Sequence, residues 1–433
     1  MAASPTFPEL VRTFTRIGFL SFGGPAGQIA LMQHEIVDQR KWVDQGAFLR
    51  ALNLCHLLPG PEAQQLATWI GWRLHGVKGG LAAGLLFVIP GALVMLGLSL
   101  IYVMASGLGW FAALFLGIKA AVLAVVLQAL LRVAGRALNT RFKQGLALAA
   151  FVALFVLALP VPLVVLGAGL IGTLVASWRP DLLALKPAGP APQFAPRPWA
   201  ASARAVLVGG VLWAAPMLAI WLTLGPDHVL WQIGAFFSKL AVVTFGGAYA
   251  VLAYMAQQAV QQFGWLSPGE MADGLGLAET TPGPLIMVTQ FVGYLAALRA
   301  PAPFSPLTAG LLGAALTTWV TFVPCFIWIF ALAPWMERLE HAKRLKGGLA
   351  AVTAAVVGVI ANLTLWFGLH VLFRAGTAVP IGPWQVQLPD PASLDWRAAV
   401  LAALAALLIF RAQWSVIRVL GVAALGGLVL GLS

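Results

Sequence analysis

The chain has 433 residues, of which 61% are hydrophobic and only 9% are charged. Because a soluble domain usually carries about a quarter charged residues, this composition excludes a water-soluble globular protein. The 46 Gly and 28 Pro residues interrupt long apolar stretches without a repeat period, which excludes a collagen-like or disordered chain. We therefore expect an all-α membrane protein that crosses the bilayer many times.

The net charge of +12 would favour nucleic-acid binding in a soluble domain. In a membrane protein, however, Lys and Arg gather in cytoplasmic loops, and this bias alone produces a basic chain. No basic stretch carries interleaved aromatic residues, so we expect no nucleic-acid partner. Cys55 and Cys325 lie in apolar surroundings without a CxxC pattern, which indicates two buried small hydrophobes and no metal or cofactor.

Apolar stretches long enough to cross a bilayer core of about 30 Å follow one another along the chain. The first, residues 14–33, is interrupted at Gly23-Gly24. Two others, 47–74 and 270–297, are each split by Pro-Gly-Pro into two short apolar helices. Uninterrupted spans are predicted at 80–104, 110–131, 205–224, 231–256, 307–333 and 347–369. Shorter apolar pairs, at 145–160 with 161–177 and at 398–411 with 412–431, are either thin spans or partly interfacial helices.

Counting each split segment as one full crossing predicts about thirteen spans. With the N-terminus in the cytoplasm, most Lys and Arg residues fall on the cytoplasmic side, whereas Arg40, Lys41 and Arg50 fall outside. Re-entrant loops would place neighbouring basic clusters on opposite sides, so we predict full crossings and a periplasmic C-terminus. Residues 178–203 are rich in Pro and Ala and are predicted to form a cytoplasmic linker.

The two halves of the chain repeat each other at an offset of 223 positions. Matching FGG, Trp and PGP in one register is hard to obtain by chance. The aligned pairs are Ser21-Phe22-Gly23-Gly24 with Thr244-Phe245-Gly246-Gly247, Trp42 with Trp265, and Leu58-Pro59-Gly60-Pro61 with Thr281-Pro282-Gly283-Pro284. We therefore divide the chain into a first repeat (1–177), a linker with a linking span (178–230) and a second repeat (231–433).

The predicted topology sends the first FGG helix outward and the second inward, so the repeats are antiparallel. Inverted repeats with paired interrupted helices are typical of secondary transporters, whose substrate site lies near the bilayer midplane.

The PGP breaks are the best candidates for that site. Proline ends the preceding helix, and the next half-helix begins with unpaired N–H groups at the positive end of its dipole. Two such ends facing each other would hold an anion. The alternative is a pair of structural kinks. The candidate residues are Pro59, Gly60, Pro61, Glu62, Ala63, Gln64 and Gln65 in the first repeat, and Thr280, Thr281, Pro282, Gly283, Pro284, Leu285, Ile286 and Met287 in the second.

The FGG pairs, Phe22-Gly23-Gly24 and Phe245-Gly246-Gly247, have two compatible interpretations. They permit close approach of the backbone or open a second break beside the site, or they serve helix packing through small residues.

Polar groups inside apolar spans are functional candidates because they are costly there. Lys119 lies nearly mid-span and is the clearest substrate-binding cation. Arg16 and Lys239 either enter the site as accessory cations or extend to the membrane interface. Gln128 and Asn362, one amide in each half, are candidate donors to a ligand or to another helix.

Three ionisable residues beside the breaks are candidates for proton coupling. His56 and Glu279 occupy equivalent positions three residues before each PGP. Glu62 follows the first PGP, where it either carries a proton or simply complements the helix dipole. Glu279 is the better carrier, because a desolvated carboxyl group binds its proton more tightly.

These segments resemble the chromate ion transporter family in its long-chain, two-domain form. The resemblance lies in FLSFGGPAGQIALMQHEIVDQRKW, LLPGPEAQQLATWIGWRLHG, GIKAAVLAVVLQALLR and TFGGAYAVLAY with GWLSPGEMADGLGLAETTPGPLIMVTQFVGY. It implies a bacterial inner-membrane carrier that exports chromate, with sulfate as a similar anion, uses the proton-motive force and confers chromate resistance. A homodimer is left open. The second repeat lacks the lysine (Thr353) and the glutamate after PGP (Leu285), so the halves cannot contribute equally.

The expected partners are thus an oxyanion and the lipid bilayer. A sulfate or other oxyanion carrier with different direction or coupling is one alternative, and an anion channel is another. An enzyme is not expected, because the chain has no P-loop, no G-x-S-x-G and no metalloprotease spacing.

Overall fold

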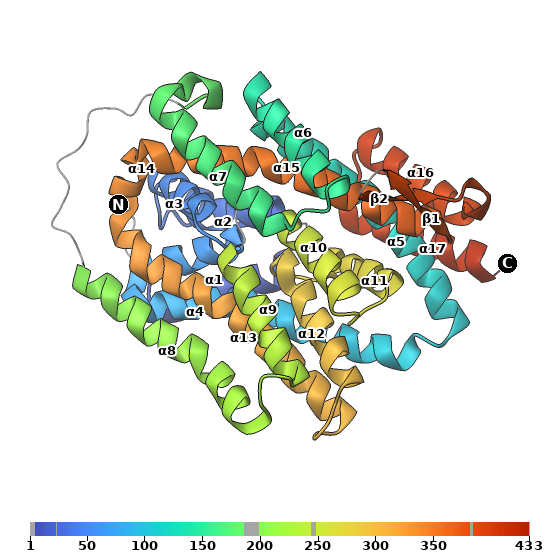
Figure 1. Ribbon diagram of the computed structural model, residues 1–433. Helices are drawn as coiled ribbons and strands as arrows, with labels where there is room; N and C mark the ends of the chain where they lie inside the picture. Colours follow the sequence, from blue (N-terminus) through green and yellow to red (C-terminus); the bar gives the residue numbers. More distant parts are fainter. Residues whose placement is uncertain (1–4, 23, 186–198, 244–247, 382–383, 433) are drawn as a thin grey trace. The chain divides into compact units, whose positions relative to one another are not determined.

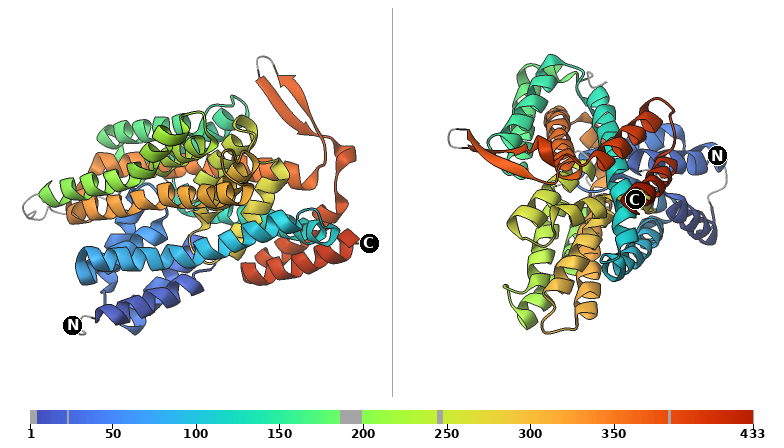
Figure 2. Two further views of the ribbon diagram at one scale, coloured as in Figure 1. Left: turned by 90° about the horizontal axis from the view of Figure 1, so that it is seen from below. Right: turned by 90° about the vertical axis from the view of Figure 1, so that its right-hand side faces the viewer.

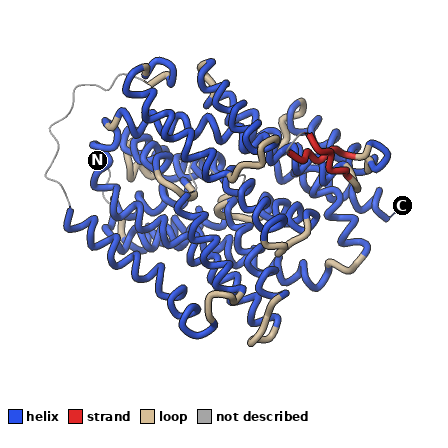
Figure 3. The backbone as a smooth tube through the Cα atoms, in the orientation of Figure 1, coloured by secondary structure: helices blue, strands red, loops and turns tan. Residues whose placement is uncertain are grey.

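The computed structural model describes residues 5–22, 24–185, 199–243, 248–381 and 384–432. Helices dominate this part of the chain (Figures 1 and 3), and one antiparallel hairpin of two strands was not predicted. The elements of the first half are α1 (Phe7–Leu20), α2 (Gly24–Met32), η1 (Gln33–Gln39), α3 (Gln45–Leu57), α4 (Glu62–Ala105), α5 (Gly109–Ala137), α6 (Arg141–Phe155), α7 (Val161–Trp178) and η2 (Pro180–Leu183).

The remaining elements begin after the segment predicted as a linker, of which residues 186–198 lie outside the described part. They are α8 (Trp199–Leu224), α9 (Val229–Val243), α10 (Ala248–Gln257), η3 (Gln258–Gln262), α11 (Pro268–Thr280), η4 (Leu285–Met287), α12 (Val288–Arg299), α13 (Pro306–Leu332), η5 (Ala333–Trp335), α14 (Met336–His341), α15 (Lys343–Leu372), β1 (Gly376–Ile381), β2 (Trp384–Pro389), η6 (Pro391–Ser393), α16 (Trp396–Phe410) and α17 (Val416–Leu432).

Six helical segments of the described chain are long and apolar enough to cross a membrane. They comprise α4, α5, α7, α8, α15 and the run of α13 into η5. Their outer surfaces carry large exposed apolar side chains, such as Leu93, Met104 and Leu207, as expected for contact with lipid. The multi-pass membrane character is therefore confirmed. The stretch predicted as one span at 231–256 is divided between α9 and α10, and residues 244–247 lie outside the described part.

The chain forms two compact units. Unit 1 contains residues 1–99, 188–251 and 281–342, and unit 2 contains residues 100–187, 252–280 and 343–433. Each unit therefore draws on both halves of the sequence. The predicted boundaries of the two repeats describe sequence similarity. Because the two units describe packing, they do not test those boundaries, which stay a prediction.

In unit 1, α4 is two helices joined by a tight turn. His75 and Gly76 have non-helical backbone angles, and Gly76 has a positive φ of 61°. The segments 62–74 and 77–105 then run back along each other. A Cβ on Gly71 would lie 2.1 Å from the Gly79 carbonyl oxygen, so only glycine permits this approach.

The first helices of unit 1 form a hairpin that turns between Ser21 and Gly24. Arg16 Nη1 on α1 lies 3.5 Å from Glu35 Oε1 on η1, and Gln28 Nε2 on α2 donates to the Ser21 carbonyl at 3.4 Å. A straight helix would separate residues 16 and 35 by roughly 28 Å. The prediction of a single span at 14–33, with Arg16 and Arg40 on opposite sides, is therefore wrong.

The first PGP segment is re-entrant as well. Gly60 lies against Cys325, in the middle part of α13, whereas α3 packs against α14, which follows the end of α13 (Figure 1). The end of α13 lies beside the turn at His75, because Phe330 meets Gly80 and Phe326 meets Gly84. Both α3 and segment 62–74 therefore lead from this end of unit 1 to the break. The predicted full crossing at 47–74 is wrong, and the count of thirteen spans does not stand.

Among the second-half helices of unit 1, α9 and α13 start from its other end. α13 begins at the turn 300–305, and the Ala302 carbonyl there is 2.7 Å from His228 Nε2, just before α9. α12 runs back along the start of α13, where Gly293 and Gly313 meet closely. α8 lies along α13 with Ser202 Oγ donating to the Ala331 carbonyl, so α8 runs antiparallel to α13.

Local structure repeats at the offset of 223 positions. Each half has a π-helical turn, η1 and η3, ended by the same two backbone hydrogen bonds. Arg40 N–H donates to the Glu35 carbonyl as Phe263 does to Gln258, and Trp42 donates to Ile36 as Trp265 does to Ala259. The two PGP glycines, Gly60 and Gly283, both have positive φ, at 112° and 85°.

In unit 2, α5, α6, α7, α15, α16 and α17 pack through small residues. Gly117 of α5 meets the backbone of α17 at Ala423, and Gly172 of α7 meets α15 at Gly347. Such contacts are typical of membrane helices, which gain from close packing rather than from burial. The hairpin β1–β2 connects α15 to α16 and extends away from both helices (Figure 2).

An ion pair closes the base of this hairpin. Arg374 Nη2 lies 2.8 Å from Asp395 Oδ2, and Asp395 also caps the first turn of α16. Burial alone would raise the pKa of Asp395, but the hydrogen bonds from Arg374 and from the Ala398 and Arg397 amides outweigh it and hold that pKa below its ordinary value.

Candidate functional site

The first PGP break packs closely against α13 at Gly60. An added Cβ on Gly60 would lie 2.8 Å from Cys325 Sγ and 3.1 Å from Gln65 Nε2. Gln65 Nε2 in turn donates to the Pro59 carbonyl at 2.7 Å, so the first turn after the break is tied back across it. Leu58 N–H bonds to the Cys55 carbonyl as α3 ends.

The second PGP break is held by the first half of the chain. Gly283 N–H donates to the Ser21 carbonyl at 2.9 Å, and the Gly283 carbonyl accepts from Gln28 Nε2 at 2.5 Å. Gly91 of α4 lies against Pro282 and Gly283, and a Cβ there would be 2.5 Å from the Pro282 oxygen. The backbone opened by this proline is thus satisfied by protein, as required at membrane depth.

The two contacts are reciprocal. The first break meets the second-half residue after Pro324, and the second break meets the first-half residue after Pro90. Because α13 and segment 77–105 are antiparallel, with Gly84 level with Phe326, the break at Gly60 is level with about residue 85. The two breaks are therefore offset by roughly six residues, or ~9 Å along the helices.

Buried polar side chains gather in the first turns after both breaks. Gln64 and Gln65 are fully buried after the first break, and Thr289 and Gln290 are buried after the second. One oxygen of each of the four has no hydrogen-bond partner among the described residues. Since buried polar atoms are normally paired, these positions are suited to a polar ligand or to water.

Two of the proton-coupling candidates lie together across the first break. His56 Nδ1 is 3.6 Å from Glu62 Oε1, with the His56 side chain half exposed and that of Glu62 largely buried. The second break has no such pair, because Leu285 replaces the glutamate. Glu279 is buried at the end of α11, and Thr280 Oγ1 donates to the Leu277 carbonyl.

In unit 2, Lys119 forms an ion pair with a residue that the sequence analysis missed. Lys119 Nζ lies 3.2 Å from Asp273 Oδ1, and Tyr102 Oη donates to Asp273 Oδ2 at 2.7 Å. Asp273 is 7% exposed, on α11. An added Cβ on Gly276, one turn later, would lie 2.5 Å from the Ile118 side chain. This close approach sets the aspartate against Lys119.

The other predicted cations and amides lie on four different helices. Arg16 joins Arg40 at the buried carboxylate of Glu35, which makes it part of a structural cluster in the first hairpin. Lys239 is exposed on α9. Gln128 and Asn362 are half-buried on α5 and α15, which pack against each other in unit 2.

The FGG motifs are only partly described. Gly23, Phe245, Gly246 and Gly247 lie outside the described residues. Gly24 has a positive φ of 69° with no atom near its missing Cβ, so it turns the first hairpin and does not pack against another helix.

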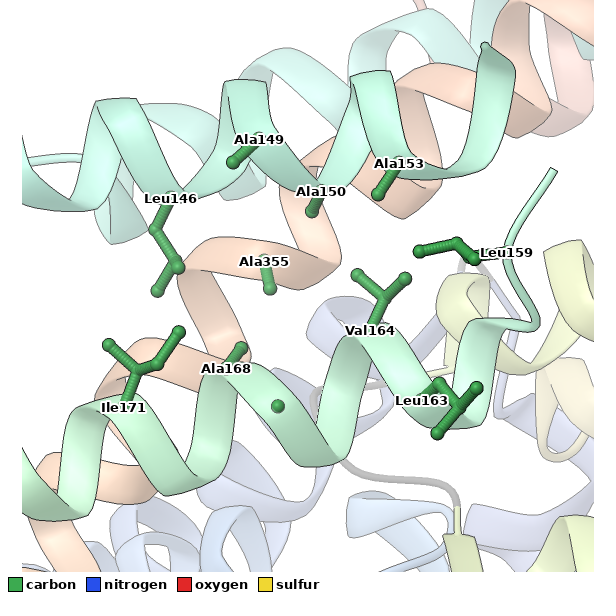
Figure 4. Close-up of a pocket in the computed structure, with 11 residues that line it drawn as sticks. Leu146, Ala149, Ala150, Ala153, Leu159, Leu163, Val164, Ala168, Ile171 and Ala355 are labelled. Atoms are coloured by element: carbon green, nitrogen blue, oxygen red, sulfur yellow. The ribbon is translucent and has the colours of Figure 1, made fainter. Parts of the chain in front are cut away.

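A separate pocket in unit 2 has no polar lining. It has a volume of about 210 Å³ and lies among Ala, Leu, Val, Ile and Gly residues of α6, α7, α15 and the connection between α6 and α7 (Figure 4). Such an apolar crevice does not suit an oxyanion.

Long apolar helices with paired helix breaks and buried polar residues define a multi-pass membrane transport protein. A sequence model of the family described as Chromate transporter matches residues 8–173 and 231–429. The chain is 32% identical over 368 residues to a chromate transport protein of Pseudomonas aeruginosa, which covers 83% of this chain and 80% of the relative.

Two other relatives align over most of both chains. A chromate transport protein of Cupriavidus metallidurans is 28% identical, over 84% of this chain and 83% of its own. A probable chromate transport protein of Synechococcus elongatus is 26% identical, over 88% and 92%. No solved structure matches. The chain belongs to the chromate transporter family, and it is a transporter rather than an enzyme.

Proposed function

We propose that the protein is a secondary active transporter that exports chromate, and sulfate-like tetrahedral oxyanions, from the bacterial cytoplasm. The observation that carries this proposal is the pair of helix breaks, one against α13 at Cys325 and the other against segment 77–105 at Gly91, offset by about 9 Å along the helices, with buried and unpaired polar side chains beside them. The relatives named for chromate transport supply the substrate.

The two repeats act as inverted halves in this proposal. In unit 1, α1 and α3 approach the breaks from the end that holds the His75 turn, whereas α9 starts from the end that holds the turn 300–305 and α12 joins the second break to that same end. Opposed approaches to a central site are the arrangement that permits alternating access.

The end of unit 1 that holds the His75 turn faces the cytoplasm in this proposal. This end holds Arg73 and Lys78 on either side of the His75 turn, and Arg204 and Arg338 near the end of α13, whereas Arg299 ends α12 at the other end. The asymmetry supports a cytoplasmic N-terminus in the plasma membrane. Because the re-entrant hairpins move Arg40 and Lys41 to this side, the bias is stronger than the sequence analysis expected.

Substrate binding is assigned to the half-helix N-termini at Pro61–Gln65 and Pro284–Met287, with Lys119 as the cation of unit 2. Glu279 is proposed as a proton carrier. Chromate is a dianion, and export of two negative charges through an inside-negative membrane gains roughly 4.6 kcal/mol per 100 mV. The electrical part of the proton-motive force is thus sufficient to drive export.

Flux in proteoliposomes at set voltage and pH tests the proposal. We expect saturable chromate transport that follows the imposed potential and is competed by sulfate. Large unitary anion currents would instead identify a channel. Transport of other anions but not of chromate would assign a different substrate. The Glu279→Gln variant tests the proton carrier: a weaker pH dependence of flux would support Glu279, and an unaltered pH profile would exclude it.

A further inference from the structure

The ion pair between Lys119 and Asp273 is an unusual use of two charges in a membrane protein. Charged side chains are rare and costly inside a bilayer, and an ion pair there is weak evidence for stability alone. Lys119 is the cation proposed to bind the oxyanion, yet its Nζ already lies 3.2 Å from Oδ1 of the Asp273 carboxylate. An anion and Asp273 therefore compete for the same ammonium group.

Protonation of Asp273 would break its ion pair with Lys119, so the groups around Asp273 decide whether this can happen. α11 packs against α5, α15 and α17. The charged and polar groups that act on Asp273 are Lys119, Tyr102 and, on its own helix, Glu270. α15 and α17 carry their ionisable residues in their terminal turns, and Glu279 lies six residues further along α11.

Tyr102 fixes the carboxylate in its position. The tyrosine hydroxyl donates to Asp273 Oδ2, and its ring packs edge-on against Phe111 and Phe115 of α5. One oxygen of Asp273 thus faces Tyr102 and the other faces Lys119. The Lys119 side chain is 25% exposed and that of Asp273 is 11% exposed, so the lysine is the more accessible partner of the pair.

We propose that Asp273 is a built-in competitor of the substrate: the oxyanion binds Lys119 only when Asp273 leaves it and takes up a proton from water. The proton adds to a carboxylate oxygen of Asp273, and the ion pair between Lys119 and Asp273 is replaced by one between Lys119 and the oxyanion. This inference rests on the proposed function and deepens it. By linkage, anion and proton strengthen each other's binding to the same extent.

The proposal fixes the charge moved in each cycle. A chromate dianion that leaves together with one proton carries a net charge of −1, not −2. The membrane potential then drives export, and the pH difference opposes it.

Proton uptake on anion binding tests this coupling in the purified full-length protein. Sulfate, which stays a dianion at both pH values, is added in a weakly buffered solution with a pH indicator, and anion binding is measured in parallel at pH 6 and pH 8. We expect the wild type to take up one proton per anion bound and therefore to bind about a hundredfold more tightly at pH 6 than at pH 8, because each pH unit changes the affinity about tenfold. The Asp273→Asn variant should bind without proton uptake and with equal affinity at both pH values.

Glu270→Gln is the matched control, because it removes a carboxylate from the same helix, one turn before Asp273. It should keep proton uptake. Tyr102→Phe supplies an independent test if Asp273→Asn folds poorly: loss of the hydrogen bond frees Asp273, and anion affinity at pH 8 should rise several-fold. In proteoliposomes, the ratio of charge to chromate flux should be one in the wild type and two in Asp273→Asn.

The outcomes separate this inference from the proposed function. Anion binding by the wild type without proton uptake, or proton uptake that persists in folded Asp273→Asn, would refute the competition while leaving transport intact. Failure of the wild type to bind or transport any tetrahedral oxyanion would refute the proposed function itself.

Discussion

The contact between Gly60 and Cys325 predicts a specific loss of stability on the Gly60→Ala change. Gly60 has a φ of 112°, and an added Cβ would lie 2.8 Å from Cys325 Sγ. A positive φ costs a non-glycine residue about 1–2 kcal/mol, and overpacking a closed core costs about 1–3 kcal/mol. We therefore expect the free energy of unfolding to fall by roughly 2–5 kcal/mol.

Gly24→Ala is the matched control. Gly24 has a similar positive φ of 69°, but nothing lies within 4 Å of the position of its Cβ. This change should cost only the backbone term, about 1 kcal/mol. Thermal unfolding of the purified protein, followed by the loss of its monodisperse elution peak, compares the two variants under the same conditions.

The Cys325→Ala change should partly rescue Gly60→Ala, because it removes the sulfur atom that the new methyl group meets. Residues in contact typically show coupling energies of about 0.5–3 kcal/mol. Equal losses for Gly60→Ala and Gly24→Ala, or additive effects of Gly60→Ala and Cys325→Ala, would show that the break is not packed against α13 as described.

Three further predictions concern the hairpins, the ion pairs and pH. Cysteines introduced at Gln39 and Arg299 should react with an impermeant reagent from opposite sides of the membrane, because the first hairpins are re-entrant; reaction from the same side would restore the full crossing. Lys119→Gln should destabilise the protein by roughly 3–5 kcal/mol, since it leaves Asp273 unpaired, and adding Asp273→Asn should restore stability but not transport; a stable single variant would contradict the pairing. Asp395→Asn should lower stability at pH 7 by at most about 1 kcal/mol. The folded-state pKa of Asp395 is lowered, so its contribution is present above the unfolded value of about 3.9 and is lost as pH falls through the folded value; a difference that persists below that pH would exclude this origin.

Sequence reasoning found the parts of this protein that depend on composition and local pattern. Apolar length identified most of the long helices, and proline chemistry located both breaks. Register matching found the repeat, whose π-helical turns and PGP glycines share the same local geometry. The family followed from the same motifs.

The sequence did not show the direction that the chain takes after each break. Gly-Gly and Pro-Gly-Pro end a helix, but whether the next helix continues or folds back depends on tertiary contacts. Here the Arg16–Glu35 ion pair and the packing of α3 on α14 decide for folding back. The excess of Lys and Arg on the cytoplasmic side also supported the wrong topology. Arg40 and Lys41 are only two of many basic residues, so placing them on the wrong side changed this excess little.

Asp273 was missed for a different reason. It lies in an ordinary helical stretch, GEMADGLGLAET, six residues before a glutamate that drew attention by its place beside PGP. The rule that an ionisable residue in an apolar segment marks function would have found it. Its pairing with Lys119, 154 positions earlier, was not visible without the fold.

The composition of the two units has a consequence for how the molecule is made. Since neither unit is built from one continuous half of the polypeptide, the ribosome must release nearly the whole chain before either body can close. A protein cut within residues 186–198 should then survive only when both fragments are produced in the same cell. Each fragment made alone would contain part of both units and could complete neither of them.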